Sequence, residues 1–203
     1  MAASQYLAFL NDLPPDEARR RQPREGERRF WVEEGGKFRL PTEAESGDLR
    51  WRPDWPALAV SWFDALAYAA WVSAREKRPF RLAHEEEWEK AARGVDARLW
   101  PFTNDHDVCY AHTTASLPGP MTPLPVGSFP TDESPYGVRD MSGGAFTWCL
   151  NESERQFRGL RGLRGGAWNQ GPTIGRCAYN QALAPESTRR SLGLRLAMSL
   201  TEW

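Results

Sequence analysis

Glycine and proline interrupt the chain every few residues from Gly94 to the C-terminus, and this pattern constrains the fold more than any other feature. Such residues break helices and favour turns, so the second half of the chain cannot be a helical bundle. Short runs with strand character lie between the interruptions. They are Gly137–Asp140, Ala145–Leu150, Phe157–Leu160, Leu163–Trp168 and Leu192–Met198. We expect short strands within much irregular structure.

Helical and hairpin signals precede this half. Ser4–Leu13 predicts a short amphipathic helix that ends at Pro14-Pro15. The charged stretch Asp16–Glu27 is expected to be solvated, and Arg28–Leu40 fits a hairpin that turns at Gly35-Gly36.

Two further helices are predicted before Gly94. The clearer one starts at Ser61, a good N-cap with Asp64 at the N3 position, and its apolar spacing continues to about Glu76. A second runs from about His84 to Arg93 and ends at a glycine. Helices followed by an irregular, strand-containing half predict a single α+β domain over residues 1–203.

The bulk composition excludes several classes of protein. A net charge of −1 over 203 residues provides no overall field for nucleic acid or an acidic membrane. We find no signal peptide, and no apolar run is long enough to span a bilayer. The 3 cysteines are widely spaced, which argues against a disulfide scaffold and for the cytoplasm. We therefore expect neither a nucleic-acid nor a membrane partner.

Several ordered segments together resemble the formylglycine-generating-enzyme (sulfatase-modifying factor) family. They are Ala59–Ala65, Arg81–Gly94, Pro125–Pro130, Tyr136–Gly143, Leu163–Trp168 and Leu192–Ala197. The resemblance implies a variant of the C-type lectin fold, in which irregular structure surrounds a small antiparallel sheet and two main helices.

Oxidases of this family bind copper through two cysteines that follow the Gly-Gly-Ser-aromatic segment. Here Gln170 and Gly175 occupy those positions, and Cys177 matches a separate family cysteine that is usually structural. One thiol cannot supply a two-thiolate site for Cu(I). The resemblance therefore implies a non-catalytic member without a cofactor.

Two other metal sites of the family are expected to be missing. Relatives bind calcium through an Asn and a Glu, which Gly144 and Thr147 replace here. Iron enzymes of the family use a histidine triad, whereas His84, His106 and His112 lack the required spacing. Metal binding by Asp105–Asp107 is an alternative to a local turn, and the turn is favoured.

Three local features can be explained by a structural role as well as by a functional one. We expect Glu85–Glu87 to be solvated or to cap the helix rather than to catalyse. Gly165-Gly166 is expected to allow close backbone approach beside a buried indole rather than to hold phosphate. Arg195 should point out of a strand or pair with an acid such as Asp140.

The resemblance also implies that the chain lacks the usual N-terminal segment. Relatives carry a strand before the helix that resembles Ser4–Asn11, and similar domains occur fused behind bacterial signalling kinases. An upstream segment or a partner chain is thus expected to complete the domain.

The segment Trp168–Arg190 is the predicted binding surface, because aromatic, amide and arginine groups suit adaptable interfaces. Arginine dominates its surroundings, with Glu186 as the lone acid between residues 155 and 195. The predicted ligand-binding residues are Trp168, Asn169, Gln170, Thr173, Ile174, Arg176, Tyr179, Asn180, Gln181, Arg189 and Arg190. The segments that bracket them also resemble those around the variable region of proteins diversified by retroelements.

Three functions stay open at this level. The primary hypothesis is a module that binds a protein or peptide through this surface, in a diversified or invariant form. A metal-dependent oxidase or oxygenase with an unfamiliar metal site is the second. The third is an assembly domain of a bacterial signalling protein.

Overall fold

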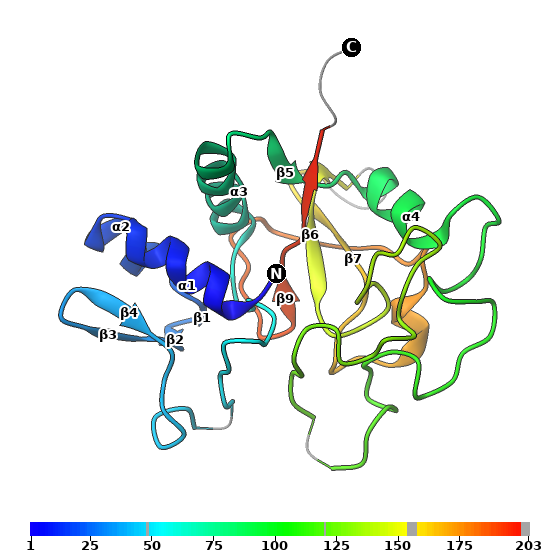
Figure 1. Cartoon of the computed structure of the whole chain (residues 1–203), viewed down its shortest axis with the longest axis horizontal. Helices are drawn as coiled ribbons and strands as arrows, with labels where there is room; N and C mark the ends of the chain where they lie inside the picture. The colour runs from blue at the N-terminus through cyan, green and yellow to red at the C-terminus, as the bar shows by residue number, and fades with distance from the viewer. Residues whose placement is uncertain (48, 120, 154–157, 200–203) are drawn as a thin grey trace.

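The computed structural model describes residues 1–47, 49–119, 121–153 and 158–199, and Figure 1 shows its arrangement. The helical segments are α1 (Ala3–Asp12), α2 (Pro15–Arg21), α3 (Trp62–Glu76), α4 (Glu85–Arg93) and the 3-10 turn η1 (Pro172–Gly175). The first strands are β1 (Arg24–Glu25), β2 (Arg28–Arg29), β3 (Val32–Glu34), β4 (Lys37–Arg39) and β5 (Phe80–Leu82). The later strands are β6 (Phe146–Glu152), β7 (Arg161–Arg164), β8 (Gln181–Leu183), β9 (Leu192–Gly193) and β10 (Leu196–Met198). The predicted α+β class is confirmed.

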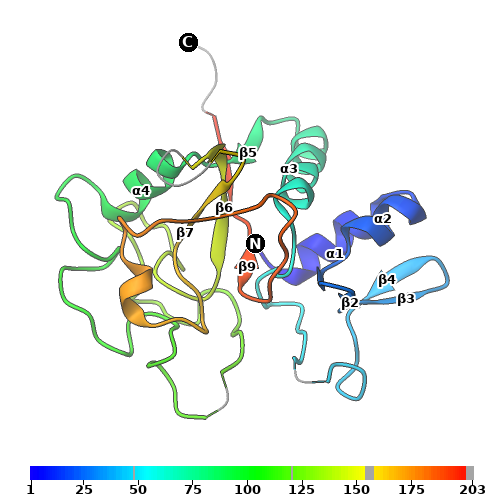
Figure 2. The same cartoon turned by 180° about the vertical axis from the view of Figure 1, so that it is seen from behind.

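A four-stranded sheet of order β8-β7-β6-β9 occupies the middle of the molecule. Its strands pair antiparallel, except that β9 runs parallel to β6. Figures 1 and 2 show α1, α2 and the hairpin β3–β4 on one side of this sheet. Helix α4 and the long loops after it lie on the other side.

Buried indoles tie the first half of the chain to the sheet. Trp148 on β6 donates from its indole nitrogen to the carbonyl of Val60 at 3.0 Å. Trp62 donates in the reverse direction to the carbonyl of Cys149 at 2.9 Å. Both rings are buried, so apolar burial and satisfied indole groups fix α3 against β6.

The predicted helices form where their end signals stand. The Ser61 hydroxyl accepts from the backbone of Asp64, whose carboxylate in turn accepts from the backbone of Ser61 at 3.0 Å. This reciprocal cap starts α3. Gly94 ends α4 in a positive-φ conformation that glycine adopts without strain.

Several boundary predictions were wrong. The stretch Asp16–Glu27 is not simply solvated, because Pro15 begins α2 with acids in the first turn and arginines in the last. Gly137–Asp140 forms no strand beyond one isolated bridge, since Asp140 adopts a φ of 56°. In Phe157–Leu160, Phe157 lies outside the described residues and the rest is not a strand.

Two predicted strands end early or divide. Leu163–Trp168 stops at Arg164, because Gly165 and Gly166 take φ values of 99° and 69°. Leu192–Met198 divides into β9, which pairs with β6, and β10, which pairs with β5. The helices of the described residues include none that is long and apolar enough to cross a membrane.

Candidate functional site

The predicted binding segment follows β7, contains η1 and the edge strand β8, and ends just before β9. Its predicted residues differ in exposure. Thr173, Arg176 and Arg189 are exposed, Trp168 is buried, and Asn169, Gln170, Ile174, Tyr179, Asn180, Gln181 and Arg190 are half-buried. The buried indole of Trp168 donates to the carbonyl of Arg190 at 3.3 Å. Trp168 thus supports the segment rather than presenting its ring to a ligand.

Four of these residues gather around one hollow, here named the loop pocket. Gln170, Tyr179, Gln181 and Arg189 line it, and it encloses about 390 Å³, part of which is open to solvent. Sequence reasoning missed its remaining lining, which is Phe146, Leu163, Leu183, Ser191 and Leu192. An apolar floor with polar groups at its edge is typical of ligand sites.

The other predicted residues lie outside this lining. Asn169, Thr173, Ile174, Arg176, Asn180 and Arg190 do not line the loop pocket. The Asn169 side-chain oxygen is buried without a hydrogen-bond partner among the described residues. The predicted surface is therefore a pocket with flanking loops.

Main-chain groups hold the second part of the segment in place. The carbonyl of Pro185 accepts from the backbone of Trp62 at 2.9 Å, and that of Arg189 accepts from Ala59 at 3.2 Å. The loop that carries Arg189 is therefore anchored to the start of α3.

The local excess of arginine does not produce a bare cationic face. Arg164 pairs with Glu85 at 3.1 Å and Arg190 with Glu25 at 3.0 Å. Arg176 lies over the ring of Trp100, 5.1 Å from its centre. These partners come from distant parts of the chain, which a count of acids within residues 155–195 could not find.

Arg189 differs from these arginines. Within the described part of the chain, no hydrogen bond or ion pair holds its guanidinium, and its side chain is exposed at the loop pocket. It can therefore offer its full charge to a ligand.

The residues present do not fit a two-thiolate copper site. A Cβ atom added at the buried Gly175 would lie 2.6 Å from both the carbonyl oxygen and the hydroxyl of Ser142. Burial raises the pKa of the Cys177 thiol to about 12 and also raises that of Cys149, which disfavours the thiolate that binds metal. No space exists for a cysteine at 175 unless Ser142 moves.

The residues present also do not fit the calcium site or the iron site that the resemblance implies for relatives. Gly144 offers no side chain, and the buried Thr147 hydroxyl donates to the carbonyl of Arg164 at 3.3 Å. Among the residues that the structure describes, no cluster of three His, Cys, Asp or Glu side chains could hold a metal ion. At Asp105–Asp107, Asp107 accepts from the backbone of Cys109, the local turn that was favoured.

Three charged side chains outside the segment are held by the protein itself. Glu85 is not solvated, because it is buried in its ion pair with Arg164. Glu87 caps α4 as expected, accepting from the backbone of His84 at 2.9 Å. Arg195 donates to the carbonyls of Arg139 and Asp140 at 2.7 and 3.1 Å, rather than to a carboxylate.

The glycine pair does bring backbones and an indole together. A Cβ atom at Gly165 would lie 3.2 Å from the ring of Trp88, and one at Gly166 would lie 3.1 Å from the backbone of Gly175. The expected close approach is confirmed.

Comparison with curated proteins finds relatives that include a protein named as inactive and a protein named as an oxygenase. The chain is 29% identical over 204 residues to an inactive Cα-formylglycine-generating enzyme 2 of Bos taurus, covering 93% of this chain and 65% of that protein. It is 32% identical over 168 residues to a hercynine oxygenase of Mycobacterium tuberculosis, covering 72% of this chain and 37% of the enzyme. The chain thus spans less than two thirds of the length of either relative.

Solved structures share the fold. PvdO from Pseudomonas aeruginosa superimposes with a TM-score of 0.75 at 24% identity, covering 98% of this chain and 77% of that one. Treponema denticola variable protein 1 superimposes with a TM-score of 0.63 at 20% identity, covering 72% of each chain. The architecture is the formylglycine-generating-enzyme variant of the C-type lectin fold. Residues 3–200 match the sulfatase-modifying factor enzyme 1-like domain, and the chain therefore belongs to that family.

Proposed function

We propose that this domain is a non-catalytic module that binds a protein or peptide over the loop pocket. The observation that carries the proposal is the convergence of Gln170, Tyr179, Gln181 and Arg189 on one hollow with an apolar floor. Phe146, Leu163 and Leu192 form that floor and are buried. These side chains expose little surface, so only a small apolar group of a ligand would reach them.

The edge of the loop pocket offers the complementary polar groups. The side-chain amides of Gln170 and Gln181 can each donate to and accept from a peptide backbone. The exposed guanidinium of Arg189 suits a carboxylate on the ligand. A peptide with one apolar and one acidic side chain would match this edge.

The absence of cysteine at positions 170 and 175 supports a binding role without oxidation chemistry. Gln170 places an amide where the resemblance expects a ligand cysteine, and Gly175 cannot accept a larger side chain without movement of Ser142. The named relatives include both an inactive protein and an oxygenase, so we retain a metal-dependent oxygenase as the second candidate. Metal analysis of protein purified without chelators separates the two, because stoichiometric copper or iron would overturn the binding module.

The fold is shared with a protein named as a variable protein, which supports a diversified form of the module. In that form, the codons of residues 168–196 would have a near-copy beside a reverse transcriptase gene. Sequencing of the neighbouring DNA tests this. An invariant region without such a copy would leave an ordinary binding module.

A peptide selection tests the binding function directly. A random peptide library displayed on phage is selected on the domain and on a variant with Tyr179, Asn180 and Arg189 all changed to Ala. We expect enriched peptides to bind the parent domain and to lose at least about tenfold in affinity for the variant.

Matched measurements exclude unfolding as the cause. Arg20 and Glu27 are exposed on the far N-terminal part, so changing both to Ala should leave capture intact. Tyr179 packs against the core, so the triple variant should melt at a lower temperature but remain folded at the assay temperature, as circular dichroism would show. Equal capture by the parent and the triple variant would show that the surface is not the binding site. If no peptide binds but an upstream segment forms a stable complex, the assembly role replaces this proposal.

The remaining expectations become part of this proposal. The three free thiols, Cys109, Cys149 and Cys177, support a reducing cytoplasm as the place of action. We propose a protein ligand rather than nucleic acid or a membrane, since the overall charge is close to neutral.

A further inference from the structure

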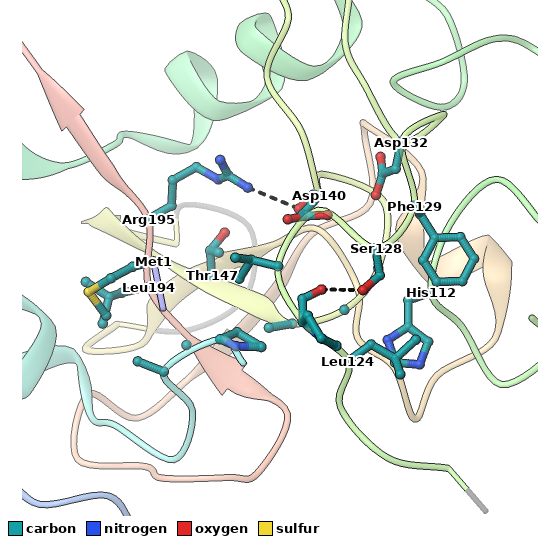
Figure 3. A pocket seen from close by; sticks show the side chains of 18 residues that line it. Met1, His112, Leu124, Ser128, Phe129, Asp132, Asp140, Thr147, Leu194 and Arg195 are labelled. Carbon is teal, nitrogen blue, oxygen red and sulfur yellow. Dashed lines mark hydrogen bonds between the residues drawn. The ribbon is translucent and has the colours of Figure 1, made fainter. Parts of the chain in front are cut away.

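A second pocket lies across β6 from the loop pocket. Here named the acidic pocket, it is lined by Leu124, Phe129, Asp132, Asp140, Thr147 and Arg195, among others, and encloses about 600 Å³, part of which is open to solvent (Figure 3). Figure 3 shows Arg195 on one side of Asp140, with Asp132, Phe129 and His112 on the other. None of these side chains belongs to the predicted binding segment.

The walls of the acidic pocket are fixed by main-chain contacts. Val126 donates from its backbone to the carbonyl of Asp54 at 2.9 Å, and Gly144 donates to that of His112 at 3.0 Å. A Cβ atom at Gly193 would lie 2.6 Å from the carbonyl oxygen of Ala57. Because backbones meet this closely, the pocket has its shape before any ligand binds.

Two carboxyl groups of this pocket lack a cation partner. Asp132 is only 2% exposed, and its two oxygens accept from the backbone of Ser142 at 3.1 and 2.9 Å. Asp140 accepts from the backbone of Gly127 at 2.8 Å. Within the described residues, neither carboxyl group forms an ion pair. A buried carboxylate without a cation is costly.

The pKa of Asp132 reflects this imbalance. Burial raises it to about 7, and the neighbouring charge of Asp140 adds to the rise, whereas Arg195 opposes it. Arg195 directs its Nη2 to two carbonyl oxygens instead of a carboxylate. Arg195 can balance only one of the two carboxyl groups, so a ligand cation would balance the other when Asp132 is ionised.

The remaining titratable groups of the pocket do not supply that charge at neutral pH. Burial lowers the pKa of His112 to about 4, and this ring stacks on Phe129 with 5.7 Å between centres. Burial and Arg195 lower the pKa of the Met1 α-amino group to about 6. Both groups are therefore mainly uncharged near pH 7.

The apolar lining indicates what the rest of the ligand is. Leu124 and Phe129 line the same space as the two carboxyl groups. Apolar walls with a few fixed polar groups suit a small molecule that has an apolar body and one charged end. Phe129 can also contact a cation through its ring face.

We propose that the acidic pocket binds an organic ammonium ion, with its charged group between Asp132 and Asp140 and its apolar body against Leu124 and Phe129. The site is separate from the loop pocket. Its occupation would not require the peptide ligand.

Calorimetric titration with 2-phenylethylammonium tests the proposal, with 2-phenylethanol as its uncharged match. We expect the ammonium ion to bind and the alcohol to bind at least about tenfold more weakly, since it loses charge-assisted hydrogen bonds. Affinity should rise between about pH 6 and about pH 8, as Asp132 loses its proton. Equal binding of the two compounds would overturn the proposal.

Variants locate the charge. Asp132→Asn should weaken ammonium binding at least about tenfold at about pH 8 and reduce its pH dependence to the part that the Met1 α-amino group contributes. Gln181→Ala, in the loop pocket, should leave it unchanged, and its failure to bind peptide would leave the ammonium result standing. Unaltered binding by Asp132→Asn would overturn the proposal, as would calcium that displaces the ammonium ion at lower concentration.

A measurement on the parent protein covers the case in which Asp132→Asn does not fold. In a carboxyl-detected NMR titration, saturating 2-phenylethylammonium should move the Asp132 pKa down by at least one unit from about 7. An unmoved titration would overturn the proposal.

Discussion

The loop pocket and the acidic pocket lie back to back on the same pair of strands. On β6, Phe146 lines the loop pocket and Thr147 lines the acidic pocket. On the parallel neighbour β9, Leu192 lines the first and Gly193 the second. Successive side chains of a strand point to opposite faces. One short strand pair therefore serves as the partition between two chemically different spaces.

The two pockets differ in how their polar groups are held. In the loop pocket, the side chains at the edge project from loops and β8, and the guanidinium of Arg189 has no partner among the described residues. In the acidic pocket, backbone N–H groups of Ser142 and Gly127 fix both carboxyl groups. Substitution of edge side chains can therefore change the ligand specificity of the loop pocket. The acidic pocket keeps the same arrangement of charges as long as its backbone stays folded.

The largest effect on stability is expected from a substitution that removes a buried contact beneath the loop pocket and leaves the lining of the acidic pocket unchanged. Changing Glu85 to Ala removes one of the two carboxylates that bind Arg164, each at 3.1 Å, and leaves Glu89 as the other. The side chains of Glu85 and Arg164 are only 6% exposed, and because Glu89 remains, the cost should stay below the about 3–5 kcal/mol of a buried charge that loses its partner. Arg164 also holds the carbonyls of Cys177 and Tyr179, so peptide binding should fall with stability.

Chemical unfolding and peptide binding measure this variant. Glu86→Ala is the matched control, because Glu86 is the exposed neighbour in the same helical turn, and its unfolding free energy should change by less than about 0.5 kcal/mol. Equal stability of the two variants would contradict the role of the buried pair.

The next effect concerns the acidic pocket and depends on pH. The pKa of Asp132 rises from 3.8 in the unfolded chain to about 7 in the folded protein. The folded protein therefore binds more protons between these values. The contribution of Asp132 to stability is complete below pH 3.8 and is lost as the pH rises through about 7. Asp132→Asn should remove this loss.

Unfolding free energies of parent and variant across this pH range test that sign. His112, whose pKa shifts in the opposite direction, is present in both proteins, so the difference isolates Asp132. A parent that gains stability relative to Asp132→Asn as the pH rises would contradict a raised pKa.

A smaller effect is expected from restoring a thiol at the loop segment. Gly175→Cys forces a Cβ atom against Ser142, and overpacking of this kind costs about 1–3 kcal/mol. Thr173→Cys, at an exposed position of the same turn, should cost little. Thermal denaturation compares the two. With Gln170→Cys added to Gly175→Cys, copper uptake without loss of stability would show that the site can still form.

The smallest effect separates charge from shape at the loop pocket. Arg189→Ala should leave the unfolding free energy within about 0.5 kcal/mol, because no described group binds its guanidinium. Affinity for an acidic peptide should fall by about 1 kcal/mol, and less at high salt. Arg20→Ala is the control for lost positive charge. If both variants bind equally, Arg189 does not contact the ligand.

The helices could be predicted because their signals are local. Ser61 and Asp64 cap α3 within one turn, and Gly94 follows the last turn of α4. Helix α2 was missed, although Pro15 and the order of its acids and arginines are also local signals. The three-residue strands could not be predicted in this way. β5 exists because Leu82 pairs with Leu196, more than a hundred positions later, and no short window of sequence contains both.

The polar residues at the edge of the loop pocket could be predicted from the sequence, whereas the apolar residues at its base could not. Gln170, Tyr179, Gln181 and Arg189 were visible as polar and aromatic groups in one segment. Phe146 and Leu192 look like ordinary core residues until the fold leaves a space above them. The sequence signal for the acidic pocket was only partial. A pairing of Arg195 with Asp140 was one expectation, but nothing in the sequence joined Asp132 to these two residues.

The carbonyls of Pro185, Arg189 and Arg190 hold the binding loop to Trp62, Ala59 and Trp168. Peptide groups are the same in every amino acid, so these anchors survive when the side chains around them are replaced. The residues at the exposed positions of the loop can therefore be substituted while its backbone keeps the same conformation. A library randomised at Thr173, Arg176 and Arg189 should remain folded across most of its members.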